Sequence, residues 1–189
     1  NLWTEDSVLD GRVRLRQRKD GYRAGMDAAL LAAACDARDD ERVIDVGCGV
    51  GGAMLAAAAR RPGARFVGVE RDPAALDLAR QNIALNGWAA RVDALEGDIA
   101  LPFSKLGLDP FDAAISNPPF FDDAGAIRGP ADSRKGAWMA DDGLAAWVGF
   151  LLKAVREGGT ITVIHRADRL ADLLALLSVK AGSFRIRPV

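Results

Sequence analysis

The chain has 189 residues, of which 50% are hydrophobic and 27% are charged, and its formal net charge is −1. This composition is typical of a soluble globular protein, and the length suits one core, so residues 1–189 are predicted to form a single domain. No apolar run reaches the ~18 residues of a membrane span. Because there is one histidine and Cys35 and Cys48 form no CxxC pair, we expect a reduced, cytoplasmic protein that binds no metal and no membrane.

Apolar runs and turn residues indicate strands that alternate with helices. Strands are predicted at Arg42–Val46, Arg65–Glu70, Arg91–Glu96, Phe111–Ser116, Thr160–His165 and Phe184–Val189. Helices are predicted at Met26–Arg38, from a glycine-rich loop to Arg61, from Pro73 to Leu85, from an N-cap at Asp142 to about Arg156, and at Leu170–Lys180, with residues 121–140 as a loop. This alternation predicts an α/β fold: a Rossmann-like, doubly wound, mostly parallel sheet with helices on both faces. Ligands of such sheets bind beyond the carboxyl ends of the strands.

The glycine-rich loop follows the strand that ends at Val46. Its sequence, Gly47-Cys48-Gly49-Val50-Gly51-Gly52, allows the backbone to turn sharply and to approach a ligand without a Cβ clash. Glu70 ends the next strand, at the ~20-residue spacing typical of a carboxylate that binds ribose hydroxyls. Gly51 and Gly52 have a second interpretation, since glycines there also permit close packing of the helix on a strand, and this is favoured for Gly52. The loop and Glu70 together predict a nucleotide site.

The glycine spacing alone does not identify the nucleotide, because Gly47, Gly49 and Gly52 also satisfy the dinucleotide fingerprint GxGxxG. Two carboxylates favour S-adenosylmethionine. Asp45, two residues before the loop, suits a ligand with an ammonium group, and Asp98, after the third strand, can accept a hydrogen bond from an adenine amine. Asp98 is also a typical turn residue, so that interpretation stays open.

The strand that ends at residue 116 leads into Asn117-Pro118-Pro119-Phe120, which has no role in hydride transfer and favours methyl transfer to a planar amino nitrogen. The lone pair of such a nitrogen is delocalised, so catalysis requires acceptors that hold both N–H groups while the lone pair points at the methyl group. The Asn117 side chain and the Pro118 carbonyl are the predicted acceptors; Pro119 helps to fix their direction, and Phe120 offers a stacking face. A rigid turn is the alternative interpretation. No general base is required, so His165 is predicted to be structural.

A basic segment lies near the start of the chain. Arg12, Arg14, Arg16 and Arg18 alternate with other residues, so a strand within residues 12–23 would place all four on one face. This face is either a charged edge that prevents aggregation or a stripe that contacts RNA phosphates. The sequence supports both interpretations equally.

The motifs resemble those of the class I S-adenosylmethionine-dependent amino methyltransferases with an NPP[YF] signature. The resemblance rests on residues 45–51, Glu70, Gly97-Asp98 and residues 117–120. Residues 17–27 narrow it, since they are similar to the lead-in of the bacterial adenine-N6 methyltransferases that act on valine tRNA.

The resemblance implies a seven-stranded Rossmann-like sheet whose antiparallel last strand is expected to be missing here, because the sequence stops at Val189. It implies S-adenosyl-L-methionine as the cofactor and catalysis by Asn117, Pro118, Pro119 and Phe120. The cofactor cleft would be lined by Asp45, Gly47, Gly49, Glu70, Asp98 and Asn117. Arg23 and Asp27 of the lead-in are expected to close over the cofactor.

The favoured function is methyl transfer to the exocyclic amine of adenine in RNA, with tRNA as the expected partner, because the arginine strand suits a small enzyme that reads a structured loop. A carboxamide presents the same planar amine, and the net charge is slightly acidic, so a protein glutamine N5-methyltransferase is the alternative. DNA methylation is third, since no duplex-reading element is present. A non-catalytic methyltransferase-like binding subunit is a further alternative, against which the intact Asn117 and Glu70 argue.

Overall fold

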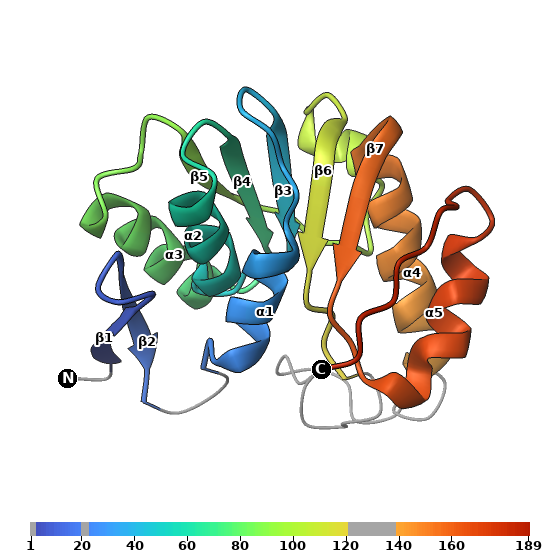
Figure 1. The fold of residues 1–189 in the computed structure, drawn as a ribbon, viewed down its shortest axis with the longest axis horizontal. Helices are drawn as coiled ribbons and strands as arrows, with labels where there is room; N and C mark the ends of the chain where they lie inside the picture. Colours follow the sequence, from blue (N-terminus) through green and yellow to red (C-terminus); the bar gives the residue numbers. More distant parts are fainter. Residues whose placement is uncertain (1–2, 20–22, 121–138) are drawn as a thin grey trace.

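Five parallel strands form the central sheet, in the order β5-β4-β3-β6-β7 (Figure 1). The computed structural model describes residues 3–19, 23–120 and 139–189. The chain runs outward from β3 to β4 and β5 and then returns to the other side of β3, so the winding reverses between β3 and β6. The predicted doubly wound parallel sheet is confirmed. The strands are β3 (Arg42–Val46), β4 (Arg65–Glu70), β5 (Val92–Glu96), β6 (Phe111–Ser116) and β7 (Val155–Val163).

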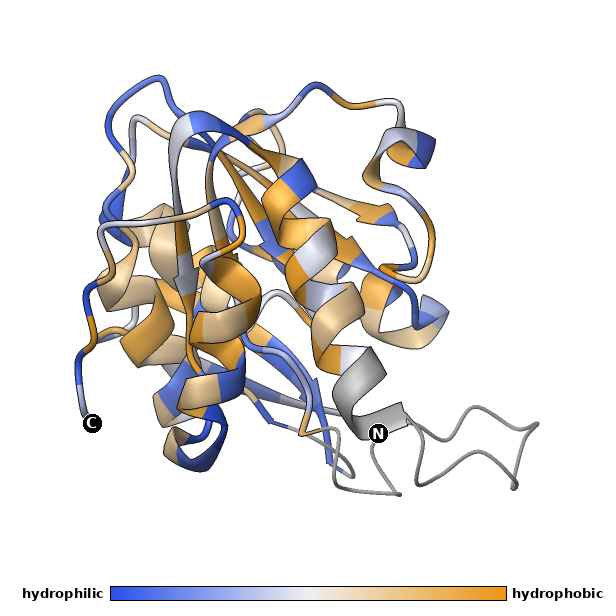
Figure 2. Cartoon of the chain, turned by 90° about the vertical axis from the view of Figure 1, so that its right-hand side faces the viewer, coloured by the Kyte–Doolittle hydropathy of each residue, from blue (hydrophilic) through white to orange (hydrophobic). Residues whose placement is uncertain are grey.

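Helices cover both faces of this sheet. Side chains of the strands alternate between two apolar layers: Val43 and Phe66 pack with the first three helices, whereas Ile44 and Val46 pack with α4. Hydrophobic residues accordingly follow the helices and strands of the interior (Figure 2). The helices are α1 (Met26–Ala34), α2 (Gly52–Arg60), α3 (Pro73–Leu85), α4 (Met139–Ala154) and α5 (Leu170–Leu177), with 3-10 turns η1 (Phe103–Leu106) and η2 (Ala167–Arg169).

The structure corrects both ends of the helix that was predicted from Asp142 to about Arg156. α4 begins three residues before Asp142, because the Met-Ala pair at 139–140 itself favours a helix. It ends at Ala154, and β7 follows at once. The strand starts early because it already pairs with the amino end of β6, where Arg156 Nε donates to Asp112 Oδ1 at 2.7 Å. The predicted loop of residues 121–140 lies mostly outside the described residues.

The predicted strand at Phe184–Val189 is wrong. Residues 181–189 form neither helix nor strand, and Phe184 and Ile186 are 46% and 54% exposed. An alternating pattern becomes a strand only when a neighbour pairs with its N–H and C=O groups, and this segment does not pair with β7. Among the described residues, no helix is long and apolar enough to cross a membrane.

An antiparallel hairpin of β1 (Trp3–Val8) and β2 (Val13–Arg18) precedes the sheet. Val13, Leu15 and Gln17 are at most 3% exposed, so the predicted alternation is confirmed for Arg14, Arg16 and Arg18, which lie on the opposite face. Arg12 was expected on the same face but lies in the turn before β2. The sequence pattern did not indicate β1, because its residues are mostly polar and only partly buried.

Two asparagines, one within α3 and one at its C-cap, take the place of a third strand beside β2. Asn82 Oδ1 accepts from the Arg16 N–H at 2.7 Å, and its Nδ2 donates to the Arg16 C=O at 3.0 Å. Asn86 makes the same pair of bonds with Arg14, at 2.9 and 2.8 Å. Asn82 Nδ2 also donates to the Val50 C=O at 2.9 Å, so this fully buried side chain joins the hairpin to the glycine loop.

Replacement of Asn82 by alanine is expected to lower the free energy of unfolding by about 3 kcal/mol, because each buried polar group left without a partner costs ~1–3 kcal/mol. Asn86→Ala is the matched control: it removes the same type of bonds at a position that water reaches, and its loss should stay below about 1 kcal/mol. Urea denaturation of both variants measures the difference. Equal losses would contradict the assigned role of burial.

Candidate active site

The loops of the predicted site meet at one edge of the sheet. Val46, at the end of β3, pairs with Ser116, at the end of β6, and β4 lies on the other side of β3. The Gly47 loop, the half-buried Asn117 and the end of β4 at Glu70 therefore lie side by side. This is the carboxyl edge at the point where the winding reverses, where ligands of such sheets bind.

The glycine loop folds back over the end of β4. The Val69 C=O accepts from the N–H groups of Gly47 and Cys48, at 2.9 and 3.1 Å. Gly47, Gly49 and Gly51 have φ values of +75°, +55° and +88°, which residues other than glycine rarely adopt. The glycines at these three positions are therefore required by the shape of the loop itself.

Gly52 and Cys48 of the loop are constrained by packing against neighbouring residues. A Cβ on Gly52 would collide with that of Ala24 in the lead-in, so the packing interpretation of Gly52 holds. Cys48 packs over Gly68, where a Cβ would lie 2.6 Å from its sulfur. Burial raises the pKa of the Cys48 thiol well above its usual value, which keeps the thiol protonated and unsuited to act as a nucleophile.

Trp147 of α4 holds the glycine loop and the catalytic segment in register. Its Nε1 donates to Ser116 Oγ at 2.8 Å, and Ser116 Oγ in turn donates to the Val46 C=O at 2.8 Å. The indole also lies against Gly47, where a Cβ would come within 2.6 Å of Cζ2. One side chain thus contacts the residues at the start of both loops.

Gly47→Ala is expected to lower the free energy of unfolding by about 1–3 kcal/mol more than Gly87→Ala, because of overpacking. Both glycines have φ values near +70°, so alanine brings the same backbone strain, but only the Gly47 Cβ would meet a neighbour, Trp147. Thermal and urea denaturation of the two variants isolate this contact. If the two variants were equally destabilised, the backbone conformation alone would explain the effect.

The Glu70 carboxylate holds the glycine loop in place by accepting hydrogen bonds from backbone N–H groups. Its Oε2 accepts from the Gly49 N–H at 2.9 Å, and its Oε1 accepts from the N–H groups of Arg71 and Asp72, at 2.9 and 2.8 Å. A carboxylate offers about four acceptor positions, so ribose hydroxyls would share oxygens that the backbone already uses. The contact of Glu70 with ribose stays a prediction. Its hydrogen bond to the glycine loop was not expected from the sequence.

Asp45 is a buried carboxyl group beneath the glycine loop. It is 2% exposed, and its Oδ2 accepts no hydrogen bond from the described residues. Burial, with a smaller contribution from the charge of Glu70, raises the pKa of Asp45 from 3.8 to about 7, although the Met54 N–H opposes this shift. The ligand-free protein therefore holds a proton here well above the pH at which an exposed aspartate loses it.

The stability of the ligand-free protein should accordingly fall between about pH 4 and pH 7. In this window the folded state keeps the Asp45 proton that the unfolded state has lost, so each rise in pH favours unfolding, up to the folded pKa of about 7. The rise in the pKa of Asp45 from 3.8 to about 7 corresponds to a loss of roughly 4 kcal/mol across this window. Asp45→Asn should remove this loss and be more stable than the wild type at pH 8. Urea denaturation at pH 5 and pH 8 tests this, with the exposed Asp109→Asn as control; an unchanged pH dependence in Asp45→Asn would refute it.

Asp98 forms a turn at the outer end of this edge. Its Oδ1 accepts from the Ala100 N–H at 2.9 Å, and its C=O accepts from the Leu101 N–H at 3.0 Å. The interpretation of Asp98 as a turn residue is therefore confirmed, with Oδ1 as the oxygen that holds the turn. The predicted contact with an adenine amine stays a prediction.

The catalytic segment has two neighbours that the sequence pattern did not indicate. Pro118 is buried and Pro119 half-buried, whereas Phe120 is 42% exposed. The Phe120 and His165 ring centroids lie 6.0 Å apart, and Arg166 Cζ lies 5.7 Å from the Phe120 centroid. His165 was expected to be only structural. His165 lies two residues after β7, which ends beside β6, so its contact with Phe120 depends on the order of the strands in the sheet.

The arginines of β2 face acidic side chains of β1. Glu5 accepts from Arg14 Nη2 at 2.5 Å and from Arg16 Nε at 3.2 Å, and these bonds lower the pKa of Glu5. Arg23, expected to lie over the cofactor, pairs with Asp6 at 2.7 Å. The positive charge of Arg14 and Arg16 is thus partly neutralised, which favours the charged-edge interpretation for these two residues.

Two recesses lie outside the predicted cofactor residues. One, of about 510 Å³, lies between η1 and α4 and begins at Ile99, directly after Asp98. The other, of about 300 Å³, lies between the hairpin and α3. Within the described residues, no cluster of three or more potential metal ligands is present.

The chain belongs to the methyltransferase small domain family, whose pattern matches residues 23–129. A tRNA1(Val) (adenine(37)-N6)-methyltransferase of Dickeya chrysanthemi is 34% identical over 173 residues, which cover 87% of this chain and 65% of that protein. A release factor glutamine methyltransferase of Chlorobaculum tepidum is 30% identical over 156 residues, which cover 78% and 53%. This chain thus spans less than two thirds of the length of either relative.

The solved structure of a predicted O-methyltransferase from Agrobacterium tumefaciens has a TM-score of 0.62 and 27% identity to this chain, and the match covers 80% of this chain and 66% of that one. The class I methyltransferase fold is thereby confirmed.

S-adenosylmethionine is the cofactor that this family indicates, in agreement with the sequence prediction. The residues fit such a ligand, because the buried Oδ2 of Asp45 lacks a hydrogen-bond donor among the described residues and an ammonium group would supply one.

Proposed function

We propose that this protein is an S-adenosylmethionine-dependent N-methyltransferase that acts on the exocyclic amine of adenine in tRNA. The observation that carries this proposal is the pairing of Val46 with Ser116, which sets the Asn-Pro-Pro-Phe segment directly beside the glycine loop. An amine held by Asn117 then lies next to the ligand that the glycine loop binds. The family membership supports the reaction class.

The cofactor supplies an activated methyl group when bound. Asp45 would bind its ammonium group, Glu70 its ribose and Asp98 its adenine, while Gly47 and Gly49 allow the close approach of the backbone.

The catalytic segment would position the acceptor. Asn117 Oδ1 and the Pro118 C=O accept the two N–H groups of the amine, which leaves the lone pair directed at the methyl group. The exposed part of Phe120 would stack on the flipped base, next to the ion pair of Arg166 with Asp168. The methylated amine releases its proton to water, so His165 need not act as a base.

The similarities favour tRNA over protein as the substrate. The Dickeya relative, named for adenine 37 of a valine tRNA, matches with higher identity over more of this chain than the Chlorobaculum relative, named for a glutamine of release factor. Glutamine methylation is the second candidate, because a carboxamide fits the same acceptors. Methylation of tRNA would place the protein in the cytoplasm.

The arginine stripe contributes unequally to this proposal. Arg14 and Arg16 hydrogen-bond Glu5, and Arg12 Nε donates to the Leu9 C=O. We retain Arg18 as the first candidate for a phosphate contact because it lines the recess between the hairpin and α3.

Asn117→Ala is expected to lower kcat for methylation of a valine tRNA transcript by at least ~100-fold, because one acceptor for the amine is lost. Transfer of label from methyl-labelled cofactor to the transcript measures kcat, and transfer to the RNA and protein fractions of a cell extract identifies the class of substrate. The surface variant Asp109→Asn, at the opposite edge of the sheet, should keep wild-type activity. Label found only in the protein fraction would refute RNA as the substrate and support glutamine methylation.

A further inference from the structure

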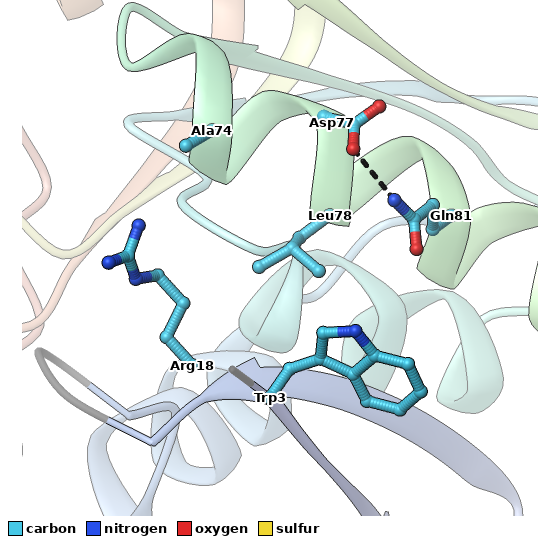
Figure 3. A pocket seen from close by; sticks show the side chains of 6 residues that line it. All are labelled: Trp3, Arg18, Ala74, Asp77, Leu78 and Gln81. Atoms are coloured by element: carbon cyan, nitrogen blue, oxygen red, sulfur yellow. Dashed lines mark hydrogen bonds between the residues drawn. The ribbon is translucent and has the colours of Figure 1, made fainter. Parts of the chain in front are cut away.

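The recess of about 300 Å³ between the hairpin and α3 combines unlike side chains. Figure 3 shows Trp3 and Arg18 on the hairpin side, opposite the side chains of one face of α3. Trp3 and Arg18 are partners in the β1–β2 ladder, so one cross-strand pair supplies an aromatic ring and a guanidinium group together. The lining residues are Trp3, Arg18, Ala74, Asp77, Leu78 and Gln81.

The side of the recess formed by α3 is apolar at its base and polar at its rim. Leu78 is 8% exposed and forms the apolar part. Gln81 Nε2 donates to Asp77 Oδ2 at 2.7 Å, which fixes both side chains (Figure 3). The carboxylate and the Gln81 carbonyl oxygen are acceptors, and they lie across the recess from the guanidinium group of Arg18.

The aromatic ring is held in place before any ligand arrives. Arg16 Cζ lies 4.7 Å from the centroid of the Trp3 ring, and Arg16 itself is held by Glu5. A fixed ring loses little conformational freedom when a ligand stacks on it, so the binding free energy is not spent on ordering the side chain.

The recess adjoins the cofactor edge of the sheet. Glu70 accepts from the Asp72 N–H at 2.8 Å, and Asp72 Oδ1 accepts from the N–H of Ala74, which lines the recess. β2 ends at Arg18 on the side of the molecule where the carboxyl ends of β3, β4 and β6 lie (Figure 1). A group bound here would therefore lie on the side of the predicted cofactor site that Glu70 forms.

We infer that this recess binds a second base of the RNA substrate, stacked on Trp3 with its amino edge toward Asp77 and a flanking phosphate at Arg18. This inference rests on the proposed RNA substrate. Single-stranded RNA is bound by aromatic stacking combined with cationic contacts to phosphate, and a carboxylate accepts from an exocyclic amine. The volume lies at the lower end of the ~300–1,000 Å³ of small-molecule pockets, which suits one base.

The test measures binding and methylation of a valine tRNA transcript by Trp3→Ala, Trp3→Phe and Arg18→Gln. Trp3→Ala should raise Kd and KM about tenfold at unchanged kcat, and Trp3→Phe should restore most of the affinity. The salt dependence separates the two contacts. Arg18→Gln should reduce the slope of log Kd against log salt by about 0.7–0.9, whereas Trp3→Ala should leave the slope unchanged.

Matched controls make each outcome decisive. Arg38→Gln, an exposed arginine outside the recess, removes one charge and should leave Kd, KM and the slope near wild type. Circular dichroism checks the fold of each variant, and Arg18→Gln, at an exposed position, serves as the test if Trp3→Ala does not fold.

The inference is overturned if the wild type methylates the transcript and folded Trp3→Ala keeps its KM. It is also overturned if Trp3→Ala weakens S-adenosylmethionine binding, which would assign the recess to the cofactor. The same holds if AMP alone binds the wild type as tightly as tRNA does and Trp3→Ala abolishes that binding, which would indicate a site for a free nucleotide. Absence of any RNA methylation by the wild type would instead refute the proposed function. Methylation of protein that depends on Trp3 would refute both.

Discussion

The parallel pairing of β3 with β6 is the constraint on which the candidate site depends. Because the winding of the sheet reverses here, the loops after these two strands leave the same edge with no strand between them. Val46 and Ser116 are 70 positions apart in the chain, yet a hydrogen bond from Ser116 Oγ to the Val46 C=O joins them at 2.8 Å. Trp147 of α4 donates a hydrogen bond to Ser116 and also packs on Gly47. One side chain of the helix therefore contacts both the start of the glycine loop and the residue before the catalytic segment.

A second constraint links this edge to the hairpin. Asn82 binds the backbone of β2 and the Val50 C=O of the glycine loop with a single buried amide. A displacement of the hairpin would therefore strain the loop that faces Glu70. The surface proposed to bind RNA and the loop expected to bind the cofactor are thereby parts of one hydrogen-bonded unit, rather than independent attachments to the sheet.

The parts of the fold that could be predicted from the sequence are those specified locally. β3, β4 and β6 have the predicted bounds because each is a short, mostly apolar segment between turn residues, and Asp72 caps α3 as expected. The failures depend on partners distant in sequence. Phe184–Val189 has a strand pattern but does not pair, and β1 lacks a clear pattern yet pairs along its whole length with β2.

The same distinction applies within the site. Motif spacing indicated the glycine loop, Glu70 and Asn117, which the register of the sheet brings together. His165 and Arg166 could not be recognised from their neighbours in sequence, because their contact with Phe120 exists only when β7 lies beside β6. The ion pairs of Glu5 with Arg14 and Arg16 likewise require the hairpin, which is why the arginine stripe remained ambiguous.

Two features of the ligand-free protein are locally unfavourable, and both lie at this edge. Asp45 is a buried carboxyl group whose pKa is raised to about 7 and whose Oδ2 has no donor among the described residues. Phe120 keeps 42% of its surface exposed beside Arg166. A cationic ligand would stabilise the first group and a stacked planar substrate the second. Local departures of this kind are expected at functional sites, where a ligand offsets them. The buried carboxyl group thus supports the proposed binding of the cofactor, and the exposed ring supports the proposed contact with a planar substrate.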